Sequence, residues 1–411
     1  MDRTLYFLRL VSGLNRTEEY SLKILSLVNK LLMLWRAEKV WRKPVTASLL
    51  IYDRCGTEIL FDYIKHDDVE ILDVRGETIN LYVMFCCIFS FELSNGSYVN
   101  RYISLVNPSV IITFIDNNPR FYELKWTHPR SVTIFIQNGL RGELADVFGI
   151  LKAGTPSVNY QVDYMLTFGA AIGEKYSEYI NGCVVPIGSI KSNRCGISKC
   201  KITNSLVFVS QFTLPLDRSE QSYFGTIDSE RITWGDFYSA DRRVIRFLAN
   251  YCERKKLILQ ICGRSSDLSG EEMNFFEEAI GDKEWEFIPR NGHFGSYAVI
   301  DGAELVVGID STLVYESLAR GNKTGIFSIR SSLLKDRSLN FGWPQQFSEN
   351  GPFWTNHADE KEFERVLDYL ISINHTRWEK ILRESITNLM DYDSGNTRFI
   401  TLLKKLQIKI N

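Results

Sequence analysis

Residues 305–329, LVVGIDSTLVYESLARGNKTGIFSI, predict a buried parallel strand, a tight turn, a helix and a second strand. The Asp-Ser-Thr triplet supplies residue types that cap helices, and Gly321 marks the helix end. A helix N-terminus at the carboxyl end of a parallel strand presents free N–H groups and a positive dipole end to an anion. We therefore expect a phosphate site at Ser311 and Thr312, with Glu316 about one turn further in and within reach of a ribose. The alternative is an ordinary βαβ unit.

Length and composition indicate a globular protein of two domains. The chain has 411 residues, of which 45% are hydrophobic and 24% charged. A net charge of -2 argues against a nucleic-acid-binding protein. The aromatic fraction of 13% is high and suits large cores or surfaces that stack on sugars and bases.

The cysteines and the apolar stretches suggest a reducing compartment. Eight cysteines are scattered without a CxxC pair, and Cys195 and Cys200 have no histidine close by, so no zinc site is expected. The first residues, MDRTLYFLRL, lack the pattern of a secretory signal. The longest apolar stretch, 81–91, is shorter than the roughly 20 residues that span a bilayer. We expect a protein of the bacterial cytoplasm.

Strand and helix patterns alternate along the chain, which predicts parallel sheets with helices on both faces. The predicted strands are 46–52, 69–74, 110–115, 132–136, 164–168 and 184–187, then 206–209, 257–262, 285–288 and 305–309. The predicted helices are 17–43, 58–65 and 79–92, then 234–255, 271–280, 359–373 and 375–391. The polar, glycine-containing stretch 190–203 is interpreted as a linker.

These elements predict an α/β protein of two doubly wound, Rossmann-like domains with a ligand cleft between them. The domains are expected at 1–190, on the acceptor side, and 204–374, and the helices of 375–411 are candidates to cross back to the first domain. The sequence contains neither GxGxxG nor GxxxxGK[ST], which argues against a dehydrogenase or a P-loop enzyme.

Basic residues at the two ends of the chain suggest contact with a membrane surface. The polar positions of the predicted 17–43 helix are mostly basic, and the tail contributes Lys404, Lys405 and Lys409. Such a pattern suits a peripheral position at the inner membrane, but it also suits a solvated face.

Polar residues follow several predicted strands of the first half. Gln137, Asn138 and Gly139 come directly after the strand at 132–136, and Arg141 follows them. Glu143 can act as a base or an acid if the cleft closes over it. A solvated loop is the alternative. Gly169 and Gly188 also follow strands, where they permit close backbone approach.

The second half offers groups for a phosphate and a nucleobase, although exposed loop residues and turn chemistry explain several of them equally well. Asp217, in a proline-containing loop, is a candidate nucleophile, and His293 is one of only five histidines. The candidate donor-binding residues are Ser210, Gln211, Arg264, Ser296 and Tyr297, together with Ser311, Thr312 and Glu316.

A DxD pair, Asp391 and Asp393, is typical of metal-dependent nucleotide-sugar enzymes, but here it follows a helix instead of a strand. Its position before Ser-Gly-Asn favours helix termination, and no metal site is predicted. Two loops with tryptophan and proline, FGWP and GPFWTN, suggest either a core wall or a contact between domains or with the acceptor.

Taken together, the chain resembles bacterial surface-polysaccharide glycosyltransferases of the GT-B fold. The similar segments are FIQNGLRGELADVFG, YMLTFGAAIGEKY, VVPIGSIKSN, DSTLVYESLARGNKTGIF, FGWP and GPFWTN, which lie between about 131 and 356. It looks nearest to the group that includes retaining β-Kdo transferases.

The resemblance implies sugar transfer from a nucleotide donor, such as CMP-Kdo, to a lipid-linked O-antigen or capsule glycan. It also implies that the second domain binds the donor, that metal and other cofactors are dispensable, and that a carboxylate is the covalent nucleophile. We assign that role to Asp217, with Glu143 as acid/base and His293 as a further catalytic candidate. The competing hypotheses are a nucleotide-sugar epimerase of the same architecture and a non-catalytic glycan-binding protein.

Overall fold

The computed structural model describes residues 35–92, 94–154, 159–198, 201–215 and 217–411. Its first half is built on a six-stranded parallel sheet in the order β3-β2-β5-β6-β7-β8. The central strands β2 and β5 are buried along their whole length, because their residues are almost all aliphatic. The strands are β2 (Leu49–Tyr52), β3 (Val69–Leu72), β5 (Val110–Thr113), β6 (Val132–Ile136), β7 (Tyr160–Thr167) and β8 (Ile180–Pro186).

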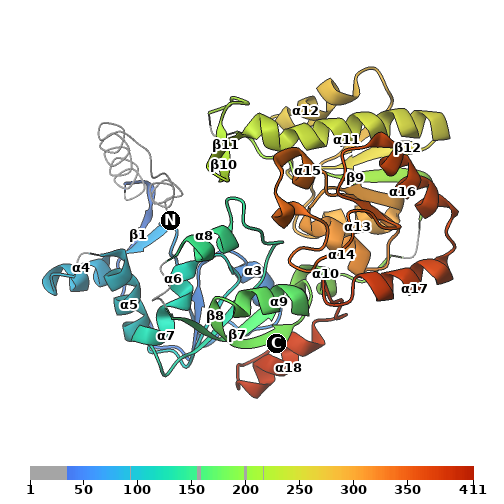
Figure 1. Ribbon diagram of the computed structural model, residues 1–411. Coiled ribbons are helices and arrows are strands. Elements are labelled where there is room, and N and C mark those ends of the chain that lie inside the picture. Colours follow the sequence, from blue (N-terminus) through green and yellow to red (C-terminus); the bar gives the residue numbers. More distant parts are fainter. Residues whose placement is uncertain (1–34, 93, 155–158, 199–200, 216) are drawn as a thin grey trace.

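Short helices surround this sheet (Figure 1). They are α3 (Thr57–Leu60), α4 (Leu81–Phe89), α5 (Asn95–Val106), α6 (Pro119–Tyr122), α7 (Leu124–Thr127), α8 (Val147–Ala153), α9 (Ala170–Ser177) and α10 (Ile190–Arg194). Two short strands, β1 (Glu38–Val40) and β4 (Thr78–Asn80), pair in parallel beside α4.

The second half is also built on a six-stranded parallel sheet, in the order β13-β12-β9-β14-β15-β16. Its strands are β9 (Ile202–Val209), β12 (Ile258–Cys262), β13 (Glu286–Ile288), β14 (Ala303–Gly308), β15 (Thr324–Phe327) and β16 (Trp354–Thr355). Its helices are α11 (Trp234–Lys255), α12 (Glu271–Ile280), α13 (Gly295–Gly302), α14 (Thr312–Ala319), α15 (Arg330–Leu334), α16 (Glu360–Ser372) and α17 (His375–Ser385), with a 3-10 turn η1 (Arg337–Leu339). A hairpin of β10 (Tyr223–Ile227) and β11 (Glu230–Thr233) precedes α11.

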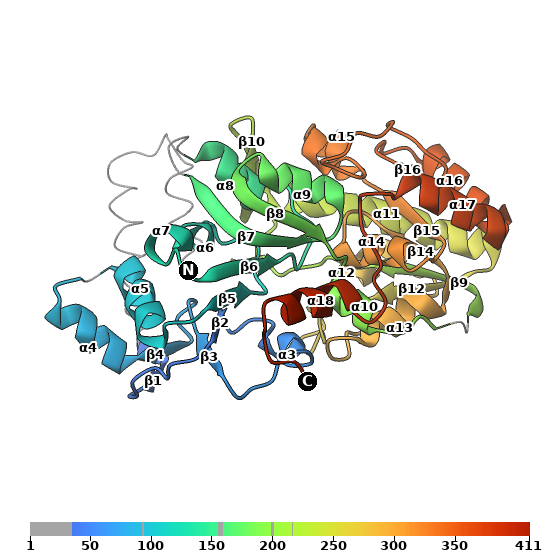
Figure 2. The same cartoon turned by 90° about the horizontal axis from the view of Figure 1, so that it is seen from below.

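The end of the chain returns to the first half. Helix α18 (Thr397–Lys405) buries Phe399, Leu402 and Leu403 in the same hydrophobic cluster as β2 and β5. Ile410 forms a β-bridge with Ile64, four residues beyond the end of α3, and the C-terminus lies beside α3 (Figure 2). On the way the chain passes close to Gly169 and Gly188. A Cβ at either glycine would lie 2.2 Å from a backbone oxygen of Asn388 or Asp391, so the close approach expected there is made by the returning chain.

Several sequence predictions are confirmed. The helices at 234–255 and 271–280 match α11 and α12 to the residue. Helix α14 ends two residues before Gly321, whose positive φ of 88° is the left-handed conformation that glycine adopts easily. Both predicted sheets are parallel and have helices packed around them, so the doubly wound α/β architecture is confirmed.

Other predictions are wrong in part. Residues 17–34 of the long predicted helix lie outside the described residues, and its end is not helical, because 38–40 form β1. The predicted linker contains α10, which Ser189 caps by accepting from the Ser192 N–H. The helices expected to reach residues 65 and 391 end at Leu60 and Ser385. Helix α5 and the β10–β11 hairpin were not expected. Within the described residues, no helix has the length and apolarity needed to cross a membrane.

Candidate functional site

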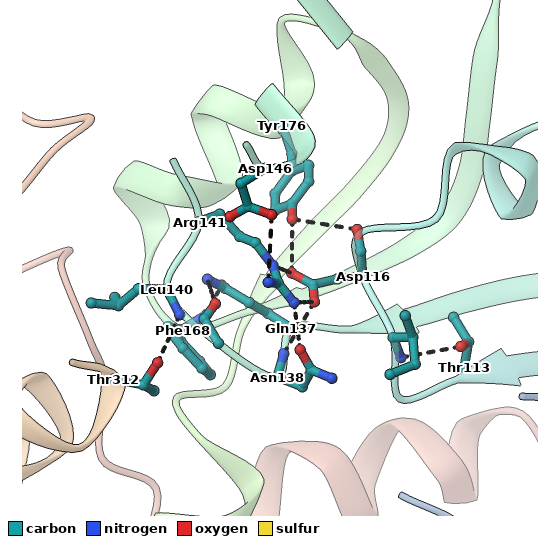
Figure 3. A network of polar contacts seen from close by, with 12 residues as sticks. Thr113, Asp116, Gln137, Asn138, Leu140, Arg141, Asp146, Phe168, Tyr176 and Thr312 are labelled. Carbon is teal, nitrogen blue, oxygen red and sulfur yellow. Dashed lines mark hydrogen bonds and ion pairs between the residues drawn. The ribbon is translucent and has the colours of Figure 1, made fainter. Parts of the chain in front are cut away.

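A buried network of polar side chains organises the carboxyl ends of β5 and β6 (Figure 3). Asp116 lies beyond β5 and is fully buried, and the Arg141 guanidinium donates to both of its carboxylate oxygens. The Tyr176 hydroxyl donates to Asp116 Oδ2 over 2.7 Å, and the Arg141 guanidinium also contacts the Asn138 side-chain oxygen. The loop that follows β6 is thereby held over the end of the sheet.

The predicted acceptor-side residues are brought together by this network. The Gln137 side chain donates to the Gly139 carbonyl over 3.0 Å and accepts from the Phe168 N–H over 2.8 Å, so it ties the ends of β6 and β7 together. The Asn138 N–H points to Asp116 Oδ1 at 3.3 Å. Gln137 is buried and makes its side-chain hydrogen bonds within the protein, so its role is structural.

One loop residue beyond the predicted set carries a perturbed carboxyl group. Asp146 accepts from the Gly142 N–H over 3.1 Å and lies 3.7 Å from the Arg141 guanidinium. Burial raises the pKa of the Asp146 carboxyl, although the positive charge of Arg141 opposes that rise. A carboxyl group with a raised pKa at a site of this kind is suited to proton transfer.

The same loop reaches the second half of the chain. The Leu140 N–H donates to the Thr312 hydroxyl over 2.9 Å, and Thr312 is the first residue of α14. Trp343, in the FGWP segment, packs edge-on against Phe148 of α8 with 5.4 Å between ring centroids. The carboxyl end of β6 therefore meets the carboxyl end of β14, and we call the meeting point of residues 137–146 and 310–312 the junction.

The N-terminus of α14 faces the junction without a side-chain cap. Ser311 is the N-cap residue, but its hydroxyl makes no capping hydrogen bond. By contrast, Thr233 and Asp236 form a complete capping box at the start of α11. The first N–H groups of a helix have no partner inside the helix, so those of α14 can bind an anion.

A second buried cluster lies where β9, β14 and β15 end. The Arg330 guanidinium is completely buried and contacts the carboxylates of Asp241 and Asp310. It also donates to Gln211 Oε1 over 2.6 Å and lies over the Phe237 ring, 3.9 Å from its centroid. Gln211, Asp310 and Arg330 follow the three strands and Asp241 lies on α11, so the cluster ties the three strand ends to this helix.

The remaining predicted donor residues line the same edge of the second sheet. Arg264 is exposed and donates to the Gln211 carbonyl over 2.9 Å. The Ser210 N–H donates to the Cys262 carbonyl over 3.0 Å, and the side chains of Cys262 and Ser296 are in hydrogen-bond contact. The ends of β9 and β12 therefore bring Ser210, Gln211, Arg264 and Ser296 together.

Glu316 is buried between the two halves. Its Oε1 accepts hydrogen bonds from the hydroxyl groups of Tyr297, over 3.0 Å, and of Ser189, which caps α10. Burial raises the pKa of the Glu316 carboxyl, because these two hydrogen bonds do not offset the loss of water around the charge. Tyr297 is itself buried and engaged with Glu316, so its ring is part of the support of this carboxylate.

The three predicted catalytic residues occupy separate and more exposed positions. Asp217 is exposed on the loop between β9 and β10, where Oδ1 accepts from the Ser219 N–H. Glu143 is paired with Lys152 over 2.7 Å. His293 is half-exposed and lies 3.9 Å from Glu58 of α3. A contact between the loop at Glu143 and the hairpin comes through Gly225, where a Cβ would lie 2.6 Å from the Leu144 side chain.

The DxD pair is occupied by structural contacts. Asp391 pairs with Arg398, and Asp393 accepts from the Thr397 hydroxyl and from the Arg398 N–H at the start of α18. The predicted role in helix termination is therefore wrong, because α17 already ends at Ser385 and these contacts are made to the first residues of α18. Among the residues that the structure describes, no group of three or more His, Cys, Asp or Glu side chains is placed to hold a metal ion.

Sequence reasoning included Arg141 but missed three buried charges on which the clusters depend, namely Asp116, Asp241 and Arg330. A charged residue directly after an aliphatic strand is the signal that could have found two of them, since VIITFID ends at Asp116 and GIFSIR ends at Arg330. Their partners Tyr176 and Asp241 lie on helices among ordinary core residues, and only the fold brings them into contact.

The Arg330 cluster predicts a pH dependence of stability. Burial outweighs the attraction of Arg330 and, with the second charge of Asp310, raises the pKa of Asp241 to about 6 from its ordinary value of 3.8. The folded protein binds the Asp241 proton more tightly than the unfolded chain does. The fold therefore gains the full stabilisation at a pH below the ordinary pKa of 3.8, and this contribution is lost as the pH rises through about 6. It amounts to at most about 3 kcal/mol.

Urea unfolding of the wild type and of Asp241→Asn from pH 4.5 to 7.5 measures this contribution. The wild type is expected to lose stability relative to the variant as the pH rises, whereas Asp228→Asn, an exposed control, should follow the wild type. Parallel curves for the wild type and Asp241→Asn would refute the assignment.

Comparisons with known proteins agree with this architecture. A family profile described as "putative O-antigen biosynthesis protein" matches residues 134–407, whereas no curated protein matches the sequence. A solved structure described as "putative UDP-N-acetylglucosamine 2-epimerase" from Listeria monocytogenes has a TM-score of 0.50 at 10% identity, with 88% of this chain and 96% of that chain covered. At this identity it indicates the fold alone, which is GT-B-like.

Two further structures align over much of their length with lower scores. The UDP-GlcNAc 2-epimerase from Neisseria meningitidis, bound to UDP-GlcNAc, has a TM-score of 0.49 at 9% identity, covering 88% of this chain and all of the other. The wall teichoic acid polymerase TagF has a TM-score of 0.45 at 9% identity, covering 88% of this chain and 89% of the other.

Proposed function

Because the chain belongs to this O-antigen biosynthesis family, we propose that it is a glycosyltransferase that moves a sugar from a nucleotide donor to a lipopolysaccharide O-antigen or capsule glycan. The observation that carries the proposal is the Leu140–Thr312 hydrogen bond. It joins the uncapped N-terminus of α14, which we take as the phosphate site, to the loop that follows β6. A donor bound on one side of the junction would therefore present its sugar to an acceptor held on the other.

In this account the second half binds the donor. The phosphate lies on the N–H groups of α14 beside Ser311 and Thr312, and the ribose lies at Glu316, whose second carboxylate oxygen is left to accept from a hydroxyl group. Arg264 adds a positive charge at the end of β12, which is separated from β14 by β9. Ser210, Gln211 and Ser296 complete the edge. Tyr297 contributes by holding Glu316.

The proposed reaction retains the configuration of the sugar. A carboxylate oxygen of Asp217 attacks the anomeric carbon, the bond from that carbon to the phosphate oxygen breaks, and the nucleotide leaves with the electron pair. The acceptor hydroxyl then attacks the same carbon, its proton passes to Glu143, and Asp217 leaves as a carboxylate. Asp146 is a second candidate for the proton because its pKa is raised. His293 is placed further out, beside Glu58.

The finer assignment is a CMP-Kdo donor and a lipid-linked glycan acceptor, with the protein held at the inner face of the cytoplasmic membrane. The support is the similarity of the segments from 131 to 356 to the retaining β-Kdo transferase group. The chemistry fits a donor with one phosphate, which a single helix N-terminus can hold.

Incubation with CMP-Kdo, with and without a glycan acceptor, followed by mass spectrometry, tests the proposal. A transferase gives an elongated acceptor, and more than one free CMP per enzyme molecule, only when both substrates are present. An epimerase converts a nucleotide sugar, such as UDP-GlcNAc, without an acceptor, and a glycan-binding protein consumes nothing. Either of the last two results would refute transfer.

The same assay in EDTA tests metal independence. We expect turnover to be unchanged, because helix dipoles and Arg264 supply the positive charge that a cation would otherwise supply at the leaving phosphate. Loss of turnover in EDTA that manganese or magnesium restores would contradict this expectation and return Asp391 and Asp393 to consideration as ligands.

A further inference from the structure

Large aromatic side chains gather on the surface of the first half, around α4 and the segment before β2. We call this surface the aromatic face. Trp35 and Trp41 are 77% and 62% exposed, and Phe89 and Phe91 are 79% and 92% exposed. Monomeric proteins rarely expose so many large apolar side chains in one place. The face consists of Trp35, Trp41, Phe85, Ile88, Phe89 and Phe91.

The face is continuous across two elements. The Trp41 ring packs edge-on against Phe85 with 5.1 Å between centroids, and Phe85 lies 6.4 Å from Phe89. Helix α4, LYVMFCCIF, contains no charged residue and buries only Val83 and Cys87. A surface helix ordinarily turns polar residues to the solvent, so α4 has the composition of a helix that is buried on both sides.

A residue just beyond α4 gives independent evidence that this surface is covered by a partner. Phe91 has a positive φ of 57°, in the left-handed region that glycine usually fills after a helix. A phenylalanine at this position, exposed to 92%, gains no packing from the described part of the chain to offset the unfavourable conformation.

Basic residues flank the aromatic side chains. Arg36, Lys39 and Lys43 are exposed on the segment that carries the two tryptophans, and none of them pairs with a carboxylate among the described residues. The acidic residues nearby in sequence are Glu38, which is exposed, and Glu92, which pairs with Arg101. Tryptophan and phenylalanine beside unpaired lysine and arginine are typical of surfaces that enter the headgroup region of an anionic bilayer.

We propose that the aromatic face is a membrane-docking surface, with α4 lying in the plane of an anionic bilayer and its aromatic side chains in the interface. The nine residues of α4 extend about 14 Å, less than half the roughly 30 Å of a hydrocarbon core, so the helix lies on the membrane instead of crossing it. The inference does not depend on the transfer reaction. It places the half that is proposed to take the acceptor next to the lipid that would carry the acceptor.

The tail is a weaker candidate for the same contact. Lys409 pairs with Asp67 over 3.2 Å, and Lys405 lies over the Tyr164 ring at 5.6 Å. These two charges, which the sequence alone suggested for membrane contact, are engaged within the first half.

Flotation of the full chain with phosphatidylglycerol-containing vesicles tests the proposal. The wild type is expected to float with the vesicles, and Phe85→Ser/Phe89→Ser/Phe91→Ser is expected to bind on the order of 1000-fold more weakly, since each phenylalanine that enters the interface contributes about tenfold. The matched control replaces three exposed apolar residues of the second half, Leu268→Ser/Met273→Ser/Ile371→Ser, and should bind as the wild type does.

A second measurement locates the contact. Brominated lipids should quench part of the wild-type tryptophan fluorescence, and Trp35→Phe/Trp41→Phe should keep vesicle binding while that quenching disappears. Undiminished binding of the triple variant, or quenching that persists without the two tryptophans, overturns the proposal. The proposal is also overturned if the wild type does not bind vesicles and instead self-associates through the aromatic face. The same holds if the aromatic face protects residues 1–34 from protease.

Discussion

Replacing Arg141 with methionine is expected to lower the free energy of unfolding by about 3–5 kcal/mol and to abolish transfer. Asp116 is completely buried, and the Arg141 guanidinium is the cation that neutralises it. Removal of one partner leaves an uncompensated buried charge, which is among the most costly changes in a protein core. The loop that carries Leu140 would lose its anchor, so the contact with Thr312 would be lost with it.

Chemical denaturation and the transfer assay together measure both effects. Lys152→Met is the matched control for the stability measurement alone, because it breaks the exposed pair with Glu143 and should cost no more than about 1 kcal/mol. The double variant Asp116→Asn/Arg141→Met removes both charges and should be more stable than Arg141→Met alone. A single variant as stable as the control would contradict the role given to this pair.

Asp217→Asn is expected to lower the turnover number by several orders of magnitude while donor binding stays near normal. The nucleophile bonds to the anomeric carbon only in the transition state and the covalent intermediate, not in the complex with the donor. Its loss should therefore change KM little. Asp217 is exposed and accepts one hydrogen bond from its own loop, so the fold should not be affected. Asp228→Asn, at the turn of the neighbouring hairpin, is the matched control.

Intact-protein mass spectrometry with the donor alone completes this test. The wild type should gain the mass of one sugar, and Asp217→Asn should not. An adduct that maps to another residue, or an active Asp217→Asn enzyme, would remove Asp217 from the mechanism. Asp236 would be a poor replacement because it closes the capping box of α11, so Asp146 and Glu143 would be tested next.

The fold could be predicted from the sequence because its signals are local. Aliphatic runs such as LLIY and VIIT are short, uninterrupted and followed by helical patterns, which is the signature of buried parallel strands. The helix from 234 to 255 was predicted to the residue since its N-cap and capping partner lie within four residues. Helix α5 was missed because Asn, Gly and Ser fill its first turn, where the Ser94 hydroxyl compensates as a cap.

The site was predictable only where it lies at strand ends. Gln137, Gln211 and Thr312 lie within four residues of the ends of β6, β9 and β14, and the topology of a parallel sheet places such residues at one edge. The pairing of Glu316 with Ser189, 127 residues away, depends on how the two halves meet. That relation is set by tertiary packing, and no spacing in the sequence encodes it.

The central claim is that the donor nucleotide binds at the junction with its ribose on Glu316. Calorimetric titration of CMP into the wild type and Glu316→Gln tests this placement most directly. The amide oxygen of glutamine can still accept from Ser189 and Tyr297, so the melting temperature should not fall. The charged hydrogen bond to the ribose is lost, so CMP should bind about 10- to 100-fold more weakly. Equal affinity for CMP in the two proteins would contradict the account.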